Sequence, residues 1–271
     1  SEAFAAMEEI VSGAARQAQV AGLLVGLAMK GERPAEIVGY ARCMRERAVP
    51  VQVPPGGCVD LCGTGGDGSN TFNISSGAAI VVAAAGERVA KHGNRSVSSQ
   101  CGSADVFEHL GVRIDVSSPV VERCLRDAGL AFLFAPAFHP SMRHAGAIRR
   151  ELAVRTAFNL LGPLTNPARP SRQLVGVPRP ELTELIARAL GMLGSERAWV
   201  VHGADGLDEI STTGYTKVSE YRDGRVNTFY LHPADLGVPK ATLSDLAGGD
   251  AATNARILTS VLEGAAGPPR D

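Results

Sequence analysis

The sequence predicts an α/β protein with two parts, a small all-helical domain and a larger domain around a mostly parallel central sheet. Apolar residues recur at helical spacing over residues 1–48, where no strand-like run occurs. From residue 58 onward, strand-like runs alternate with helical ones, which is the pattern of a parallel sheet covered by helices. A cluster of prolines and glycines at residues 50–57 separates the two regions and marks a boundary or hinge.

The amino-terminal region is expected to form three helices. Phe4, Met7 and Ile10 share one helical face, and residues 18–29 are apolar nearly all round. Pro34 opens a further helix, because proline is well tolerated at a first helical position. A helix that is apolar all round needs burial on several sides, so we expect a helical subdomain or a subunit interface.

The second region alternates between strands and helices. The expected strands are 58–62, 88–90, 112–115, 131–134, 173–177, 198–202 and 227–231, and residues 221–226 are expected to form a hairpin turn into the last of them. The expected helices are 74–85, one with Ser103 as N-cap, one with Pro119 in its first turn, 139–161 and 180–193. We expect a helical domain at 1–50 joined by helices from about 139–165, and an α/β domain over the rest of 51–271.

Composition excludes several classes of protein. The 271 residues are 45% hydrophobic, so a large core is expected. The formal net charge is -1, so the positively charged surface that binds nucleic acid is not expected. The five cysteines contain no Cys-x-x-Cys pair, which argues against a disulfide framework or zinc site and predicts reduced thiols in the cytoplasm. No apolar run is long enough for a membrane span, and an acidic start argues against secretion.

A glycine-rich segment follows the strand expected at 58–62. Gly63, Gly65, Gly66 and Gly68 permit backbone angles barred to other residues, and a small-residue helix follows them. Loop amides and helix-start amides then point toward one place, where an anion can bind. Glycine clusters also form ordinary turns, so this segment alone leaves both interpretations open.

A basic segment at residues 91–99 follows the next strand. It contains Lys91, His92, Asn94 and Arg95 together with three serines, a set that can hold phosphate by charge and hydrogen bonds at once. The alternative is a solvated basic loop. Because both polar segments follow strands of one parallel sheet, we expect them to lie at the same edge.

Three carboxylates follow the strand at 198–202. Magnesium is held in proteins by a few carboxylates together with waters and substrate phosphates, so Asp208 and Glu209 suit a phosphate-bound metal, with Asp205 nearby. An Asp-Glu pair also occurs in solvated turns, so that interpretation stays open here. His109, His144 and His202 are interpreted as structural or surface histidines.

Taken together, these segments resemble the anthranilate phosphoribosyltransferase family of the tryptophan pathway over nearly the whole chain. The motifs that carry the resemblance are 63–68 (GTGGDG), 73–76 (NISS), 91–95 (KHGNR), 102–105 (GSAD), 155–167 (RTAFNLLGPLTNP) and 206–210 (GLDEI). The resemblance implies a fold of the nucleoside phosphorylase/phosphoribosyltransferase type and dimerisation through the helical domain. It also implies Mg²⁺ as cofactor and transfer of phosphoribose from phosphoribosyl pyrophosphate (PRPP) to the amine of anthranilate.

The motifs and the basic segment together define the predicted substrate and metal residues. Those predicted to bind PRPP are Gly63, Gly66, Asp67, Thr71, Asn73, Ile74, Ser75, Ser76, Lys91, His92, Gly93, Asn94, Arg95, Ser96, Val97, Ser98, Ser99 and Ser103. Those that the resemblance implies for anthranilate are Gly63, His92, Asn94 and Arg149. Those that it implies for magnesium are Ser75, Asp208 and Glu209. No side chain is expected to act as a covalent nucleophile or strong base. The family usually begins before Ser1 and continues beyond Asp271. If the family's carboxyl-terminal part packs on the α/β core, a chain that ends at Asp271 is expected to be less stable.

Two other kinds of protein share features with this sequence. A pyrimidine nucleoside phosphorylase has a similar fold and a similar Lys-His-x-Asn-Arg segment, but residues 162–167 and the Asp208-Glu209 pair favour the transferase. A non-catalytic relative that binds nucleic acid is expected to have lost the glycine loop or the carboxylates and to carry a basic groove. This sequence keeps both the glycine loop and the carboxylates, and it shows no obvious basic groove. The expected partners are therefore the two small substrates and a second copy of the chain, without nucleic acid or membrane.

Overall fold

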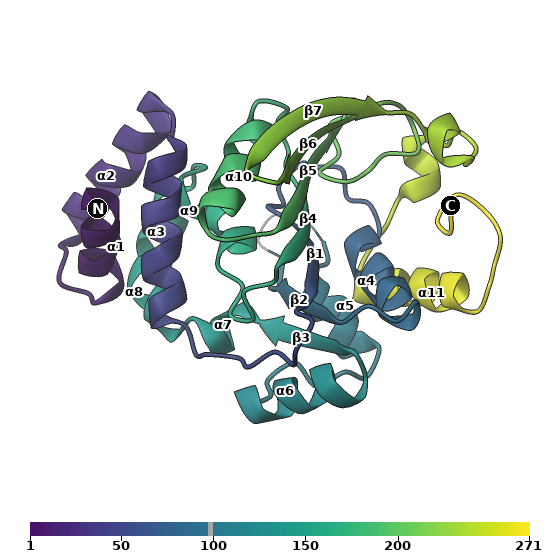
Figure 1. The fold of residues 1–271 in the computed structure, drawn as a ribbon, viewed down its shortest axis with the longest axis horizontal. Helices are drawn as coiled ribbons and strands as arrows, with labels where there is room; N and C mark the ends of the chain where they lie inside the picture. The colour runs from purple at the N-terminus through teal and green to yellow at the C-terminus, as the bar shows by residue number, and fades with distance from the viewer. Residues whose placement is uncertain (97–99) are drawn as a thin grey trace.

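The computed structural model describes residues 1–96 and 100–271 and has two parts, a helical bundle and an α/β part (Figure 1). The first elements are α1 (Glu2–Val11), α2 (Gln17–Lys30), α3 (Pro34–Arg47), β1 (Val59–Gly63), α4 (Ile74–Ala84), β2 (Val89–Gly93), α5 (Ser103–His109), α6 (Ser118–Asp127), β3 (Leu130–Phe134), α7 (Ala135–Phe138) and η1 (Pro140–Met142). The remaining elements are α8 (Arg143–Leu152), α9 (Phe158–Leu161), η2 (Gly162–Leu164), β4 (Arg172–Gly176), α10 (Leu182–Met192), β5 (Arg197–Gly203), β6 (Thr216–Arg222), β7 (Arg225–Leu231), η3 (Pro233–Leu236), η4 (Leu243–Leu246) and α11 (Ala251–Leu262).

The central sheet confirms the predicted mostly parallel α/β fold. Seven strands in the described part of the chain lie in the order β3-β2-β1-β4-β5-β6-β7, and β1 to β5 run parallel. β6 and β7 form an antiparallel hairpin whose turn lies at Asp223 and Gly224, which have the positive φ angles that such a turn requires. The chain order reverses between β1 and β4, so the sheet has its topological switch point there.

Helices cover both faces of the sheet, as a parallel sheet requires. On one face α4 packs over β1 and β2, with α5 and α11 beside it, and on the other lie α6 and α10 (Figure 1). α10 lies between the sheet and α3, and its core residues Ile186 and Leu190 belong to the same apolar cluster as Met7 and Ile37 of the bundle. The two parts therefore share one hydrophobic core.

The bundle contains helices from two places in the sequence. α1, α2 and α3 come first in the chain, whereas α8 packs against α1 and α2, and α9 packs against α3. The described residues include no helix that is both long and apolar enough to cross a bilayer.

Three local predictions were wrong. Residues 112–115 form no strand; Ile114 instead packs as part of a loop against Phe107 and Phe132, because a short apolar run can be buried without joining a sheet. The helix expected at 139–161 is broken by Ala153 in the left-handed conformation, and α9 begins only after it. β2 extends to Gly93, so Lys91 and His92 lie on a strand and not on a loop.

Candidate active site

The candidate site lies where the segments following β1, β4 and β5 meet, at the switch point of the sheet. The loop after β5 folds back over the ends of β1 and β4 so that Asp208 lies directly on Gly63 and Gly176. A Cβ on Gly63 would lie 2.5 Å from Asp208 Oδ2, and a Cβ on Gly176 would overlap the Asp208 carbonyl group. Both glycines are therefore required by the close approach of this loop, which sequence pattern alone did not indicate for Gly176.

The predicted metal residues Ser75, Asp208 and Glu209 are brought together by this loop. The Gly65 amide donates to Asp208 Oδ2 at 2.9 Å, and the Ser75 amide at the start of α4 donates to the Glu209 carboxylate. Burial raises the pKa of Glu209 to about 8, with a further contribution from the charge of Asp208. Burial, together with the nearby Asp67 carboxylate, raises the pKa of Asp208 to about 6.

This carboxylate cluster fits a divalent cation. Asp67, Asp208 and Glu209 repel one another in a site surrounded by protein, and a cation between them removes that repulsion. Within residues 1–96 and 100–271, no three His, Cys, Asp or Glu side chains are arranged to hold a metal by themselves. Mg²⁺ in proteins commonly takes several of its ligands from water and substrate phosphate.

Lys91 is a buried cation beside the cluster. Its side chain is 1% exposed, and its ammonium donates to the Leu61 carbonyl at 2.6 Å and to Ser75 Oγ at 3.1 Å. Burial lowers the pKa of Lys91, and the charges of Asp60 and Glu209 oppose that effect. An ammonium has three donors, so two acceptors among the described residues leave one donor for a ligand.

The glycine loop after β1 is shaped by its backbone and held from outside. Gly65, Gly66 and Gly68 all have positive φ angles, and the Asp67 carboxylate accepts bonds from the amide and hydroxyl of Ser69. The guanidinium of Arg155, from the segment between α8 and α9, donates to the carbonyl groups of Gly65 and Gly66. Its side chain occupies the space that a Cβ on Gly66 would need.

A polar network supports the start of α4. Thr71 forms a bridge to Ala247, the Asn73 amide group donates to the Cys101 carbonyl at 3.3 Å, and Asn254 donates to Asn73 Oδ1 at 2.9 Å. Asn254 lies 181 residues away in sequence, so its role was missed. Ile74 and Ser75 open the helix, and the buried Ser76 hydroxyl has no hydrogen-bond partner among the described residues. A buried polar atom without a hydrogen-bond partner is uncommon in proteins.

The remainder of the basic segment packs on α5. Arg95 forms ion pairs with Asp105 at 2.9 Å and Glu108 at 2.6 Å, so part of its bonding capacity is already used within the protein. The Ser96 amide donates to Asp105 at 3.2 Å. The predicted residues Val97, Ser98 and Ser99 lie outside the described part of the chain.

Ser103 is not an N-cap, contrary to expectation. Gly102 is the N-cap of α5, and Ser103 is the first helical residue. The Gly102 amide already donates to Asp105 three residues on, which satisfies the start of the helix without the serine. Ser103 Oγ instead lies beside Gly93 and donates to the Asn94 carbonyl at 3.4 Å.

Two buried histidines, His92 and His139, lie close together. The rings of His92 and His139 lie 5.2 Å apart, and His92 Nδ1 donates to the Gly162 carbonyl at 3.1 Å. Nε2 of each ring is buried without a partner among the described residues. Burial lowers the pKa of His92 to about 3 and that of His139 to about 4, so both are neutral. His139 was not predicted as a site residue.

Arg149 and Asn94 lie on different segments of the chain. Arg149 lies in the last turn of α8, with its guanidinium 5.2 Å from the centre of the Phe158 ring of α9, and burial lowers its pKa. Asn94 follows β2, and its side-chain oxygen accepts from the Arg95 amide at 2.8 Å. Arg149 does not stand out from the sequence pattern of its helix, so only the resemblance identifies it.

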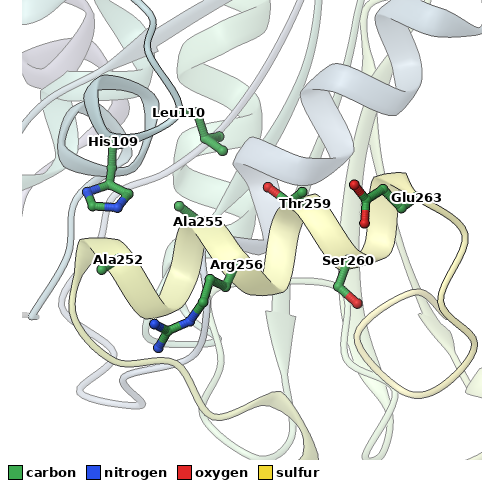
Figure 2. A pocket seen from close by; sticks show the side chains of 8 residues that line it. All are labelled: His109, Leu110, Ala252, Ala255, Arg256, Thr259, Ser260 and Glu263. Carbon is green, nitrogen blue, oxygen red and sulfur yellow. The ribbon is translucent and has the colours of Figure 1, made fainter.

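Asp205 and His202 form hydrogen bonds within the protein. Asp205 accepts bonds from Ser211 and Thr213 and so braces the loop that carries Asp208. His202 Nδ1 bonds the Val177 carbonyl at 2.9 Å. His109 lines a shallow pocket of about 300 Å³ between α5 and α11, and none of the predicted site residues lines that pocket (Figure 2).

Comparison with known proteins matches both parts of the chain to family models. Residues 56–271 match the glycosyl transferase family, a/b domain, and residues 1–48 match the glycosyl transferase family, helical bundle domain. Among curated relatives, the anthranilate phosphoribosyltransferases of Moorella thermoacetica and Syntrophobacter fumaroxidans are 56% and 55% identical over 271 residues. The match covers all of this chain and 80% of each relative.

Solved structures agree in fold. The anthranilate phosphoribosyltransferase of Thermus thermophilus superposes with a TM-score of 0.94 at 44% identity, over 99% of this chain and 80% of that one. The Saccharomyces cerevisiae enzyme in complex with PRPP and Mg gives a TM-score of 0.82 at 34% identity, over 90% and 68% of the two chains. The yeast enzyme with 4-fluoroanthranilate gives 0.83 at 32% identity, over 94% and 74%.

Proposed function

This chain belongs to the anthranilate phosphoribosyltransferase family, and we propose that its site transfers phosphoribose from PRPP to the anthranilate amine, releasing pyrophosphate. The observation that carries the proposal is the meeting of Lys91, the Asp208-Glu209 pair and the amino-terminus of α4 at one sheet edge. An anion-binding helix start, a buried cation and a divalent-metal site together suit a diphosphate group.

The chemistry needs charge stabilisation more than proton transfer. Breaking the anomeric C–O bond leaves negative charge on pyrophosphate and positive charge on the ribose. The free donor of Lys91 and the amides of the loop after β1 would stabilise the departing pyrophosphate. These groups are fixed before the reaction, because Lys91 is already held by Leu61 and Ser75, so little reorganisation is needed.

Mg²⁺ is the cofactor that this site suits, with Ser75, Asp208 and Glu209 as the residues that would hold it. When bound, the ion supplies neutralisation of the charge that develops on pyrophosphate. The raised pKa values of Asp208 and Glu209 support this role, since both carboxylates lack a compensating positive charge of sufficient strength nearby.

Anthranilate would lie on the histidine side of the site. Since His92 Nδ1 donates to Gly162, its Nε2 carries the lone pair and can accept a hydrogen from the substrate amine. Arg149 would bind the carboxylate in two places, and Asn94 and Gly63 would border the ring. An aromatic amine is already neutral, so a His92 pKa of about 3 is compatible with orientation without strong base catalysis.

A direct assay tests the function. We expect the chain to release pyrophosphate from PRPP when anthranilate and Mg²⁺ are present, with a matching loss of anthranilate fluorescence. Omitting the metal should abolish most of the turnover. Phosphorolysis of thymidine or uridine in place of this reaction would instead identify a pyrimidine nucleoside phosphorylase and contradict the proposal.

The bundle is the part we propose as a homodimer interface. Residues 1–50 with about 139–165 would form the helical domain, and α2 presents Val25 and Met29 to solvent, at 36% and 84% exposure. An exposed apolar helix face of this kind is typical of a subunit interface. Sedimentation should give a dimer mass, and Val25→Glu with Met29→Glu should give a monomer.

A cytoplasmic location is part of the same proposal. None of the five cysteines forms a disulfide in the part of the chain that the structure describes, and burial raises the pKa of Cys58 to about 12. Unreactive, reduced thiols are compatible with a reducing compartment. Cell fractionation with an antibody against the chain tests this location.

A further inference from the structure

The seam between β1 and β2 differs from the other seams of the parallel sheet. β1 pairs with β4, and β2 with β3, over five residues each, whereas the β1–β2 pairing in the described residues is the single pair Val59 and Val89. Beyond this pair the two strands separate, on the side that leads to Lys91 and His92. Backbone groups along such a gap need other partners, because buried N–H and C=O groups are costly when unpaired.

Asp60 and Asn166 fill this gap with side-chain hydrogen bonds. Asp60 Oδ1 accepts from the His92 amide at 3.2 Å, and the Asn166 amide group donates to the Ala90 carbonyl at 2.8 Å. Asn166 also donates to Asp60 Oδ2 at 2.9 Å, so the two side chains act as one unit. Both are 0% exposed, and Asn166 Oδ1 is fixed by the Ala168 amide.

Lys91 fills the gap from the opposite face. Leu61 packs against Ala79 of α4, and Lys91 contacts Ser75 of α4, so both side chains lie on the α4 face. Asp60 precedes Leu61 and therefore points to the other face, because successive side chains of a strand alternate. The Lys91 ammonium takes the Leu61 carbonyl, which a regular parallel ladder would pair with a backbone amide of β2.

We infer that Asp60 and Asn166 are positioning residues for phosphoribosyl transfer, because they keep β1 apart from β2 and so leave the Leu61 carbonyl for Lys91. Without the pair, the His92 amide would bond Leu61 in a regular ladder, and the ammonium would lose the acceptor that orients it. The buried Asp60 carboxylate also compensates the buried charge of Lys91 across the seam. This role rests on the proposed function of Lys91 at the pyrophosphate.

Two substitutions test the pair. Asp60→Asn places an amide against the Asn166 amide, and Asn166→Ala removes the bridge to the Ala90 carbonyl. We expect the Kd for PRPP with Mg²⁺, measured by calorimetry, to rise about 10- to 100-fold in each, as for a misplaced binding group. The KM for anthranilate should change by less than about threefold, because the His92 ring keeps its separate bond to Gly162.

Ser219→Ala is the matched control. Ser219 is equally buried and bonds Thr183 at 2.9 Å, on the far side of the sheet from β2. It should lower the unfolding midpoint in urea while both substrate constants stay unchanged. A merely structural role of the Asp60–Asn166 pair would give the same pattern as this control.

Each outcome decides between the two roles. Folded variants that bind PRPP as the wild type does, or that lose both substrates equally, overturn the inference. If Asp60→Asn does not fold, Asn166→Ala decides; if neither folds, the pair serves folding alone and the inference is wrong. A wild-type chain that releases no pyrophosphate overturns the proposed function itself, whereas an active wild type with unaffected variants overturns only the role of this pair.

Discussion

The two sides of the site are built differently. The side proposed for pyrophosphate consists of strand ends, a helix start and a loop of one sheet, and its groups bond one another directly, as Lys91 bonds Ser75. The side proposed for anthranilate combines His92 of β2 with His139 and Arg149, which belong to the chain segment that enters the bundle. The first side is therefore preorganised by the sheet, whereas the second depends on how the bundle packs on it.

The electrostatics of the two sides also have opposite signs. Burial raises the pKa values of Asp208 and Glu209 and lowers those of His92 and His139. The first pair favours a cation between its members, and the second pair keeps a neutral, apolar surface for an aromatic ring. Burial disfavours the charged form of each group, which is the deprotonated form of a carboxyl group but the protonated form of an imidazole. The same effect can therefore prepare two kinds of subsite.

The largest expected effect comes from the metal residues. Asp208→Asn with Glu209→Gln should reduce kcat by about 10³-fold, close to 4 kcal/mol, because the charge developing on pyrophosphate loses its counter-ion. Steady-state rates at saturating Mg²⁺ measure it. Asp223→Asn, in the exposed hairpin turn, is the control for loss of a surface carboxylate and should leave kcat unchanged. Unaltered turnover in the double variant would refute the metal role.

Arg149→Ala should weaken the binding of anthranilate and leave that of PRPP unchanged. Losing a two-point bond to a carboxylate costs about 2–3 kcal/mol, so the KM for anthranilate should rise about 30- to 160-fold. The KM for PRPP should change little. Arg150→Ala, at the exposed neighbour on the same helix, is the control. Equal losses for both substrates would contradict the separation into two sides.

The unfolding free energy should depend on pH with opposite signs for the groups on the two sides of the site. The lowered pKa values of His92 and His139 give stability that is full above about pH 6.5 and is lost as pH falls toward 4 and 3. From pH 7.5 to 5.5 this loss is about 2–3 kcal/mol of unfolding free energy for the two buried rings.

The raised pKa values of Asp208 and Glu209 act in reverse. Their contribution is full below about pH 4 and is lost as pH rises through about 6 and 8. Metal-free wild type should therefore show a flatter pH dependence than Asp208→Asn with Glu209→Gln, in urea unfolding at pH 5.5, 6.5 and 7.5. Parallel curves for the two proteins would show that the carboxylates do not titrate as proposed.

The smallest effect is expected from Gly63→Ala. Its Cβ would lie 2.5 Å from Asp208 Oδ2 and must displace that carboxylate, at a cost of about 1–2 kcal/mol. The Kd for PRPP with Mg²⁺ should rise about tenfold by calorimetry. Gly214→Ala, which has open space around its Cβ position, is the control and should bind normally.

The sequence pattern predicted the main helices and strands better than the short segments that join them. The run from Pro34 to Arg47 and the turn at Asp223 and Gly224 are set by local rules, and the structure has both as expected. The strand expected at 112–115 was wrong because Ile114 satisfies its burial under α5 without pairing. Short apolar runs carry too little information to separate these outcomes.

By itself, the sequence determined the alternation that makes a parallel sheet, the glycine loop, the basic segment and the acidic pair, since each depends on neighbours within a few residues. Only the tertiary structure decided that Asp208 lies on Gly176, that Asn254 holds Asn73, and that Asp60 and Asn166 separate β1 from β2. These contacts join residues more than 30 positions apart. No local pattern encodes them, because they arise only when the strand order of the sheet brings distant segments to one edge.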